Sequence, residues 1–217
     1  MTYAIKAPAR YAQGAGELAN LGRSAKKLGN KFLVICTDNS RGRFGAQVEA
    51  SLAEQEKEVV FTTFHGEATK DEVFAKMDEC RAQGCDVVVG MGGGKALDTA
   101  KAVADNYNAA VIIVPTTAST DAPAMGLSVI YTAAGEHVGA RHYKKNPDLV
   151  LLDTDILAKA PIRFLVAGMG DALSTYPECR ANVQSASPNY VNSGYHQTIA
   201  CIAVSKACHE TILTKGF

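Results

Sequence analysis

The chain has 217 residues, of which 22 are basic and 22 are acidic, so it carries no formal net charge at neutral pH. This balance gives no support to nucleic acid or an anionic membrane as a partner, since both favour a basic surface. The length suffices for one or two domains with a substantial core. No apolar run is long enough to span a bilayer and the first residues do not resemble a signal peptide, which predicts a cytoplasmic protein.

The cysteine pattern agrees with that location. There is no CxxC pair, and most cysteines fall in expected helices or strands. We therefore expect reduced, small core residues rather than a disulfide framework. The six positions are Cys36, Cys80, Cys85, Cys179, Cys201 and Cys208.

The N-terminal half alternates expected helices with expected strands. In chain order they cover residues 17–28, 32–36, 46–57, 59–64 and 70–83. Thr69 and Glu72 have the spacing of a capping box for the last helix, and Gly84 closes it. The alternation predicts an α/β fold with a Rossmann-like parallel sheet covered on both faces.

Polar residues, among them Asp38, follow the strand over residues 32–36. In an open parallel sheet, ligands bind beyond the carboxyl ends of the strands. An acidic side chain there can accept hydrogen bonds from ribose hydroxyls, so Asp38 is a candidate for cofactor binding. The alternative is a solvated turn or a helix cap.

A glycine-rich turn is the most informative stretch. An apolar run over residues 86–89 ends in the sequence GMGGGK over residues 90–95, and a helical pattern over 96–104 follows at once. Adjacent glycines let backbone N–H groups approach an anion closely, and the helix N-terminus points at the same place. Lys95 adds a full positive charge. The turn therefore predicts a phosphate-bearing ligand, against the alternative of a tight turn with no ligand.

Two familiar phosphate motifs do not match this turn. The P-loop pattern needs a glycine at position 89 and a serine or threonine at position 96, where the chain has Val89 and Ala96. The GxGxxG dinucleotide pattern begins with Gly90 and Gly92 but meets Lys95 where its third glycine belongs.

The second half of the chain changes character at Pro161. Before it we expect a strand over 109–114, a hairpin from strands over 127–131 and 138–143, and a short strand over 149–152. After it the pattern is entirely helical, with helices over 162–184 and 197–213. We therefore expect an α/β domain over residues 1–161 and the start of a second, all-helical domain over residues 162–217; the resemblance described next implies that the first binds the cofactor and that the second is the incomplete start of a metal domain. The apolar start of the last helix also predicts a homo-oligomer.

Four runs in the chain resemble the NAD-dependent glycerol dehydrogenases: GMGGGKALDTAK, PTTASTDAP, LSVIYT and GMGDALSTYPE, in that order. These enzymes belong to the metal-dependent alcohol dehydrogenases, which include the iron-containing ones and share a fold with dehydroquinate synthase. The resemblance implies NAD and a catalytic zinc, with iron as the alternative, as cofactors. It implies glycerol or a related vicinal diol as substrate, oxidised to dihydroxyacetone or the matching hydroxyketone.

The resemblance also implies roles for individual residues. Asp171, an aspartate among small residues in an apolar helix, matches the carboxylate metal ligand; a helix cap or an ion pair is the alternative. Asp121 matches a contact to the substrate hydroxyls, and the two aspartates are the candidate catalytic residues. Relatives place an acidic residue at the end of the strand over 32–36, and either Asp38 or Thr37 matches that position. At position 125 some relatives carry a smaller polar residue, where this chain has Met125. The implied cofactor-binding residues are Asp38, Gly93, Gly94, Lys95, Asp98, Thr116, Thr117, Ser119, Leu127 and Tyr131.

Chains of this family continue well beyond residue 217, and the further part carries two of the three metal ligands. His196 and His209 do not match those ligand positions. We therefore expect weak activity, or none, from this chain alone. The alternative is a catalytically silent NAD-binding interaction protein that retains the cofactor half. A phosphate-eliminating enzyme of the dehydroquinate synthase type is disfavoured by the runs PTTASTDAP and GMGDALSTYPE.

Overall fold

The computed structural model describes residues 7–185 and 205–214. The chain divides into two compact units. The α/β unit comprises Pro8–Thr117 and Ala122–Ala160. Within the described residues, the helical unit comprises Ala7, Ala118–Asp121 and the chain from Pro161 onward.

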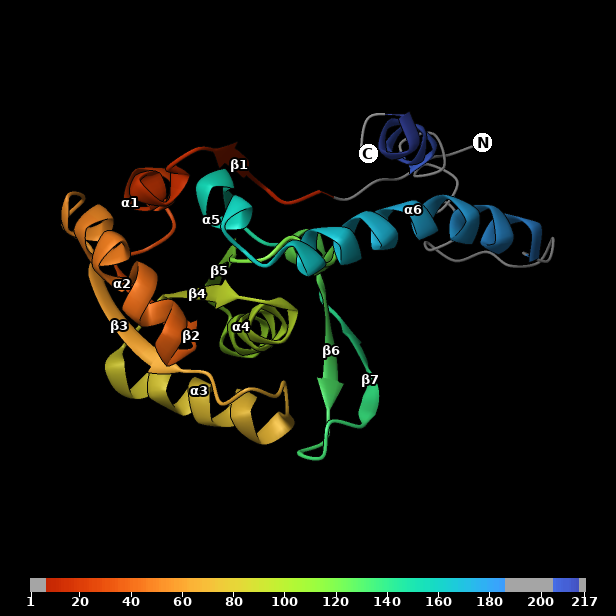
Figure 1. Cartoon of the computed structure of the whole chain (residues 1–217). Coiled ribbons are helices and arrows are strands. Elements are labelled where there is room, and N and C mark those ends of the chain that lie inside the picture. Colours follow the sequence, from red (N-terminus) through yellow and green to blue (C-terminus); the bar gives the residue numbers. More distant parts are fainter. Residues whose placement is uncertain (1–6, 186–204, 215–217) are drawn as a thin grey trace. The chain divides into compact units, whose positions relative to one another are not determined.

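The α/β unit is built on a six-stranded sheet in which every neighbouring pair is parallel (Figure 1). This confirms the predicted Rossmann-like α/β class. The strand order is β1-β8-β5-β4-β2-β3. The strands are β1 (Tyr11–Gly14), β2 (Lys31–Cys36), β3 (Glu58–Thr63), β4 (Val87–Gly92), β5 (Ala110–Pro115) and β8 (Leu149–Asp153).

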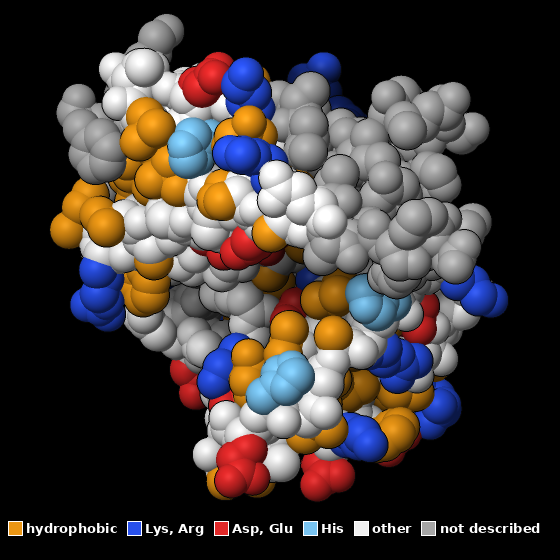
Figure 2. All heavy atoms as spheres, turned by 90° about the vertical axis from the view of Figure 1, so that its right-hand side faces the viewer, with side chains coloured by type: hydrophobic (Ala, Val, Ile, Leu, Met, Phe, Trp, Pro, Cys, Tyr) orange, Lys and Arg blue, Asp and Glu red, His pale blue; other side chains and the backbone are white. Residues whose placement is uncertain are grey.

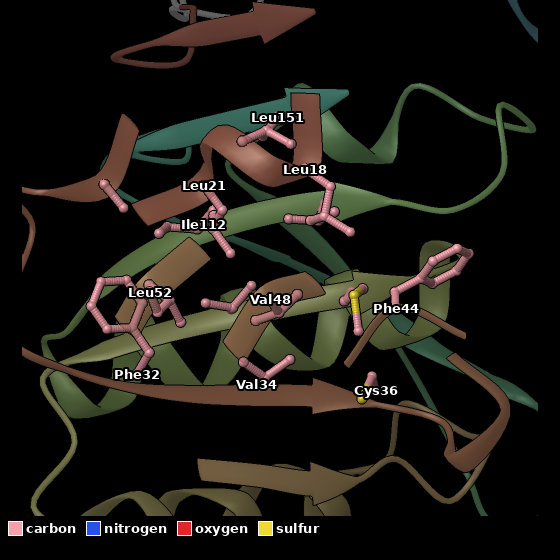
Figure 3. Packing of buried hydrophobic residues seen from close by; sticks show 14 of the residues in the cluster. Leu18, Leu21, Phe32, Val34, Cys36, Phe44, Val48, Leu52, Ile112 and Leu151 are labelled. Atoms are coloured by element: carbon pink, nitrogen blue, oxygen red, sulfur yellow. The ribbon is translucent and has the colours of Figure 1, made fainter. Parts of the chain in front are cut away.

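Helices cover both faces of this sheet because the strands are apolar on both sides. In β2, Phe32, Val34 and Cys36 pack in one core cluster with η1, α1, α2 and α5 (Figures 1 and 3). Leu33 and Ile35 pack in the other cluster with α3 and α4. The elements are η1 (Glu17–Asn20), α1 (Leu21–Ala25), α2 (Asp38–Ala53), α3 (Lys70–Gln83), α4 (Gly94–Tyr107), η2 (Ala122–Ala124) and α5 (Thr154–Ala158).

The start of α2 corrects the sequence interpretation. The predicted helix over residues 46–57 begins already at Asp38, and the predicted turn after β2 is its first turn. The cause is Thr37, whose side-chain oxygen accepts a hydrogen bond from the Ser40 N–H at 3.2 Å and caps the helix. The predicted helix over residues 17–28 is also shorter, because it divides into η1 and α1 and ends at Ala25.

The predicted hairpin is present as a separate two-stranded antiparallel sheet of β6 (Leu127–Tyr131) and β7 (His137–His142). The predicted capping box is half formed. Thr69 caps α3 by accepting from the Glu72 N–H at 3.1 Å, whereas the Glu72 carboxylate binds the backbone N–H and ring of His65. Gly84 ends α3 with a φ of 66°, as its predicted closing role requires.

The helical unit contains α6 (Ile162–Ser185), one continuous helix with Pro177 inside it. This confirms the helix expected over residues 162–184. Residues 205–214 are also helical, while the first part of the helix expected over 197–213 lies outside the described residues. No helix in the described part of the chain is long and apolar enough to cross a membrane. The five described cysteines are free thiols.

Candidate functional site

The sheet topology has a switch point between β2 and β4. These strands are neighbours, but the helices that follow them, α2 and α4, pack on opposite faces of the sheet. In open α/β sheets such a switch point is where ligands bind, outside the carboxyl ends of the strands. The residues at those ends are Thr37 and Asp38 after β2, Gly93 and Gly94 after β4, and Thr116 and Thr117 after β5.

The glycines of the turn do two different things. Gly90 and Gly92 lie in β4, where a Cβ would come within 2.7 Å of the Ala100 Cβ and 3.0 Å of the Ala96 Cβ, respectively. They are therefore required for packing α4 onto the strand. A Cβ on Gly93 would meet only the Thr117 Oγ1, at 3.7 Å. Apart from this hydroxyl, the space beside Gly93 is open.

The N-terminus of α4 has no side-chain cap. Three α-helices of the α/β unit are capped by a side-chain oxygen, from Thr37 on α2, Thr69 on α3 and Asp153 on α5, whereas α1 and α4 are not. On α4 the capping position is Gly93, which makes no such bond. The first N–H groups of a helix have no partner within the helix. At α4 no side chain from the capping position binds them, and the helix dipole there favours an anion.

Thr116 lies beside this helix end, and Asp38 lies at the end of the neighbouring strand β2. The Thr116 N–H donates to the Gly92 carbonyl at 2.9 Å, which holds the end of β5 beside the glycine turn. Asp38 is exposed in the first turn of α2, and its Oδ1 accepts a hydrogen bond from Thr63 Oγ1 at 2.8 Å. The Thr37 side chain is engaged in capping α2, whereas the Asp38 carboxylate is exposed at this strand end.

Lys95 has a partner that the sequence did not indicate. Its Nζ lies 2.5 Å from Glu67 Oε2 and 4.9 Å from the centre of the Tyr131 ring. The lysine is half exposed, so solvent screens this pair. Glu67 lies 28 residues earlier, in the loop before α3, and no local pattern links the two.

Asp98 is buried beneath the hairpin. Its Oδ2 accepts the Val129 N–H at 2.9 Å, and its Oδ1 lies 2.8 Å from Lys101 Nζ. The same ammonium group donates to the carbonyls of Ala122, at 2.8 Å, and Leu127. Asp98 and Lys101 thus attach β6 to α4. This arrangement fixes the strand that carries the cofactor candidates Leu127 and Tyr131.

The helical unit brings Asp121 and Asp171 together. Asp171 is exposed on α6, and its Oδ2 accepts the Asp121 N–H at 3.0 Å. Gly168 permits this contact, because a Cβ there would lie 2.0 Å from the Ala118 carbonyl oxygen. Ser119 belongs to the same short segment of this unit and has an interaction partner.

A metal at Asp171 needs ligands other than the described residues. Among residues 7–185 and 205–214, no group of three His, Cys, Asp or Glu side chains is arranged to hold a metal ion. His209 is engaged elsewhere, with its Nδ1 3.0 Å from the Leu173 carbonyl oxygen and its ring against Tyr176. His196 lies outside the described residues. One carboxylate alone binds zinc or iron weakly, so the described residues do not by themselves form a metal centre.

Basic, acidic and hydrophobic side chains are interspersed on the face seen in Figure 2, which shows no extended field of one sign. A protein that neutralises many phosphates of a nucleic acid presents a basic patch or stripe. This face therefore offers no such footprint.

Known proteins with related sequences cover the whole chain. Glycerol dehydrogenase of Citrobacter freundii is 41% identical over 216 residues, which is 100% of this chain and 59% of that protein. Glycolaldehyde reductase of Halobacterium salinarum is 38% identical with the same coverage. The chain thus spans about 59% of the length of these curated relatives.

A solved structure and a family profile agree with these relatives. The structure of a probable glycerol dehydrogenase from Sinorhizobium meliloti superposes with a TM-score of 0.88 at 35% identity, covering 99% of this chain and 58% of that one. The profile of the iron-containing alcohol dehydrogenases matches residues 8–154. This chain belongs to the iron-containing alcohol dehydrogenase family.

Proposed function

We propose that the α/β unit binds NAD, with its pyrophosphate against the N-terminus of α4. The observation that carries this proposal is the helix end at Gly93, which has no side-chain cap and opens at the switch point of the sheet. A pyrophosphate supplies the anionic oxygens that unpartnered N–H groups and a helix dipole favour. Because Gly93 has no side chain, those oxygens can come close to the backbone.

The remaining candidates fit the other parts of the dinucleotide. Asp38 can accept hydrogen bonds from ribose hydroxyls at the end of β2. Thr116 and Thr117 offer hydroxyls beside the glycine turn, and Lys95 offers a positive charge there. Leu127 and Tyr131 are held in place by the buried Asp98–Lys101 pair and are proposed to face the nicotinamide.

We propose that the chain serves the oxidation of glycerol or a related vicinal diol to dihydroxyacetone or the matching hydroxyketone. When bound, NAD supplies the acceptor for the hydride that leaves the alcohol carbon. Asp121 is proposed to bind substrate hydroxyls. The names of the relatives support a small polyol, and the glycolaldehyde reductase extends the class to two-carbon substrates. A reducing, cytoplasmic setting is part of the proposal.

We propose Asp171 as one ligand of a metal, zinc or iron, in a metal domain that starts at residue 162 and follows a cofactor domain over residues 1–161. Because the described residues supply no complete ligand group, this chain alone should oxidise glycerol weakly or not at all. A catalytically silent NAD-binding protein is the competing proposal. It predicts that no metal and no added protein chain restores turnover.

Calorimetric titration with NAD tests the cofactor site. The parent chain should bind, and Gly93→Val should weaken binding about tenfold or more, because its side chain fills the space beside Thr117. Gly14→Val, on the edge strand β1, is the control and should bind like the parent. Failure of the parent to bind, or unchanged binding by Gly93→Val, contradicts the proposal.

NADH production from glycerol with excess zinc or iron tests the reaction. The 217-residue chain should be close to inactive. A chain extended to the relatives' full length should form NADH, and Asp171→Asn in that extended chain should abolish the activity. An extended chain that binds NAD but never forms NADH supports the silent alternative. Robust turnover by the 217-residue chain alone overturns the assignment of an incomplete ligand group.

A further inference from the structure

A second hollow lies between α3, the end of α4 and the β6–β7 hairpin. Its volume is about 430 Å³. Figure 1 shows the N-terminal end of α3 turned toward the hairpin. Ile130 lines this hollow, and successive strand residues point to opposite faces. The hollow is therefore on the other face of β6 from Leu127, and no residue of the glycine turn lines it.

The walls of the hollow are mostly apolar. Val73 and Ile130 are buried in the floor, at 4% and 9% exposure. Phe74 and Val138 stand at the edges with 57% and 52% of their surface exposed. Two large exposed hydrophobic side chains on either side of a hollow can close over an apolar guest, since each such contact removes apolar surface from water.

The charges at the edges are positive. Lys70 and Arg141 line the hollow, and no acidic residue does. Arg141 is already satisfied, because its Nη2 lies 3.2 Å from Asp105 Oδ2 and 2.8 Å from Asn106 Oδ1. Lys70 makes no hydrogen bond or ion pair with any other described residue. It also occupies the first position of α3, where the helix dipole disfavours a cation, so helix stability does not explain it.

We propose that this hollow binds a small amphipathic anion, with an apolar ring or chain in the floor and one carboxylate or sulfonate at Lys70. Its volume lies within the range of about 300–1,000 Å³ typical of small-molecule sites, and apolar walls with few polar groups are typical of them too. Glycerol fits poorly, because apolar walls leave its hydroxyls without partners. A dinucleotide fits poorly as well, because the lining contains no glycine-rich turn at a helix N-terminus.

Fluorescence titration with two matched probes tests the site. Anilinonaphthalene sulfonate is the anion, and phenylnaphthylamine is the same aromatic body without the charge. Both probes are titrated in the presence of saturating NAD, which is to keep the probes out of the proposed NAD site. Lys70→Gln should weaken binding of the sulfonate about fivefold and leave the neutral probe within about twofold of the parent.

Two aromatic truncations locate the probe. Phe74→Ala removes an exposed aromatic side chain from the edge of the hollow and should weaken binding of both probes about fivefold or more, whereas Tyr11→Ala removes a similarly exposed aromatic side chain from β1 and should have no effect. The proposal is overturned if Phe74→Ala binds both probes like the parent, or if Lys70→Gln affects both probes equally. It is also overturned if neither probe binds the parent chain.

Discussion

Replacing Lys101 with methionine should destabilise the α/β unit strongly, because it leaves a charge buried without its partner. The Lys101 and Asp98 side chains are only 2% and 9% exposed, and their charged atoms lie 2.8 Å apart. Methionine keeps most of the apolar stem but removes the ammonium group. The Asp98 carboxylate would retain only the Val129 N–H, and the carbonyls of Ala122 and Leu127 would lose a donor.

Removing one partner of a buried ion pair costs about 3–5 kcal/mol. Each buried carbonyl left without a hydrogen-bond donor adds about 1–3 kcal/mol, although water that enters by local opening offsets part of that cost. We expect a loss of about 3–5 kcal/mol against a total of roughly 5–15 kcal/mol for a domain of ordinary stability. The effect should therefore be a large fraction of the unit's stability.

Urea unfolding followed by circular dichroism measures this loss. Lys145→Met is a matched control, since Lys145 pairs with Asp148 at the same sequence spacing and the same 2.8 Å, but is 58% exposed. The control should lose no more than about 1 kcal/mol. Asp98→Asn combined with Lys101→Met should cost clearly less than the sum of the two single changes. A near-neutral Lys101→Met, or strictly additive effects, would refute this reasoning.

Three further changes have distinct expected outcomes. Gly168→Ala should push α6 away from the Ala118 backbone, because the new methyl carbon would lie 2.0 Å from the Ala118 carbonyl oxygen, and it should lower the thermal midpoint by several degrees. Gly170→Ala is the control and should leave the midpoint unchanged, because a Cβ there meets open space. Burial raises the pKa of the Cys36 thiol to about 11, so its contribution to stability is complete below about pH 9 and is lost as the pH rises through about 11. Urea midpoints across that range should fall, and less so in Cys36→Ala. Ile162, Leu165 and Val166 are exposed on α6 at spacings of three and four residues, which puts Leu165 and Val166 on the side of Ile162, so light scattering should show self-association that lysines at positions 165 and 166 reduce.

The sheet was predictable because its signals are local. Each strand is an apolar run bounded by turn residues, and each run is continuous because helices cover both faces of a parallel sheet. The end of β4 was harder to predict, since its glycines resemble a turn. In the structure Gly90 pairs with Ile113 and Gly92 with Pro115, so the parallel ladder continues through them. Pairing with β5, and not the residue type, therefore decides that these glycines belong to the strand.

The start of α2 was missed for a different reason. Thr37, Asp38 and Ser40 are residues that favour turns and helix caps alike, because their short side chains bind nearby backbone groups. The structure selects the cap, with Thr37 Oγ1 accepting from the Ser40 N–H. This choice matters for the site, because it turns Asp38 from a loop residue into a member of a helix with a defined direction.

The partners of site residues could not be predicted from the chain alone. Lys95 meets Glu67 across 28 residues, and Asp98 meets Val129 across 31. Such pairs depend on how α4 lies against the loop before α3 and against β6, and no spacing in the sequence records that. Only the Asp98–Lys101 spacing carries a local signal, because residues three apart share one side of a helix.

The buried pair also bears on how the cofactor candidates work together. Asp98 belongs to the motif that carries the glycine turn, yet its carboxylate is directed to the hairpin rather than to the end of α4. It therefore links the helix that presents unpartnered N–H groups to the strand that carries Leu127 and Tyr131. A dinucleotide held by both would require the two to keep a fixed spacing, because its pyrophosphate and nicotinamide are joined covalently. A rigid, buried ion pair between α4 and β6 supplies that spacing in a way that a screened surface pair could not.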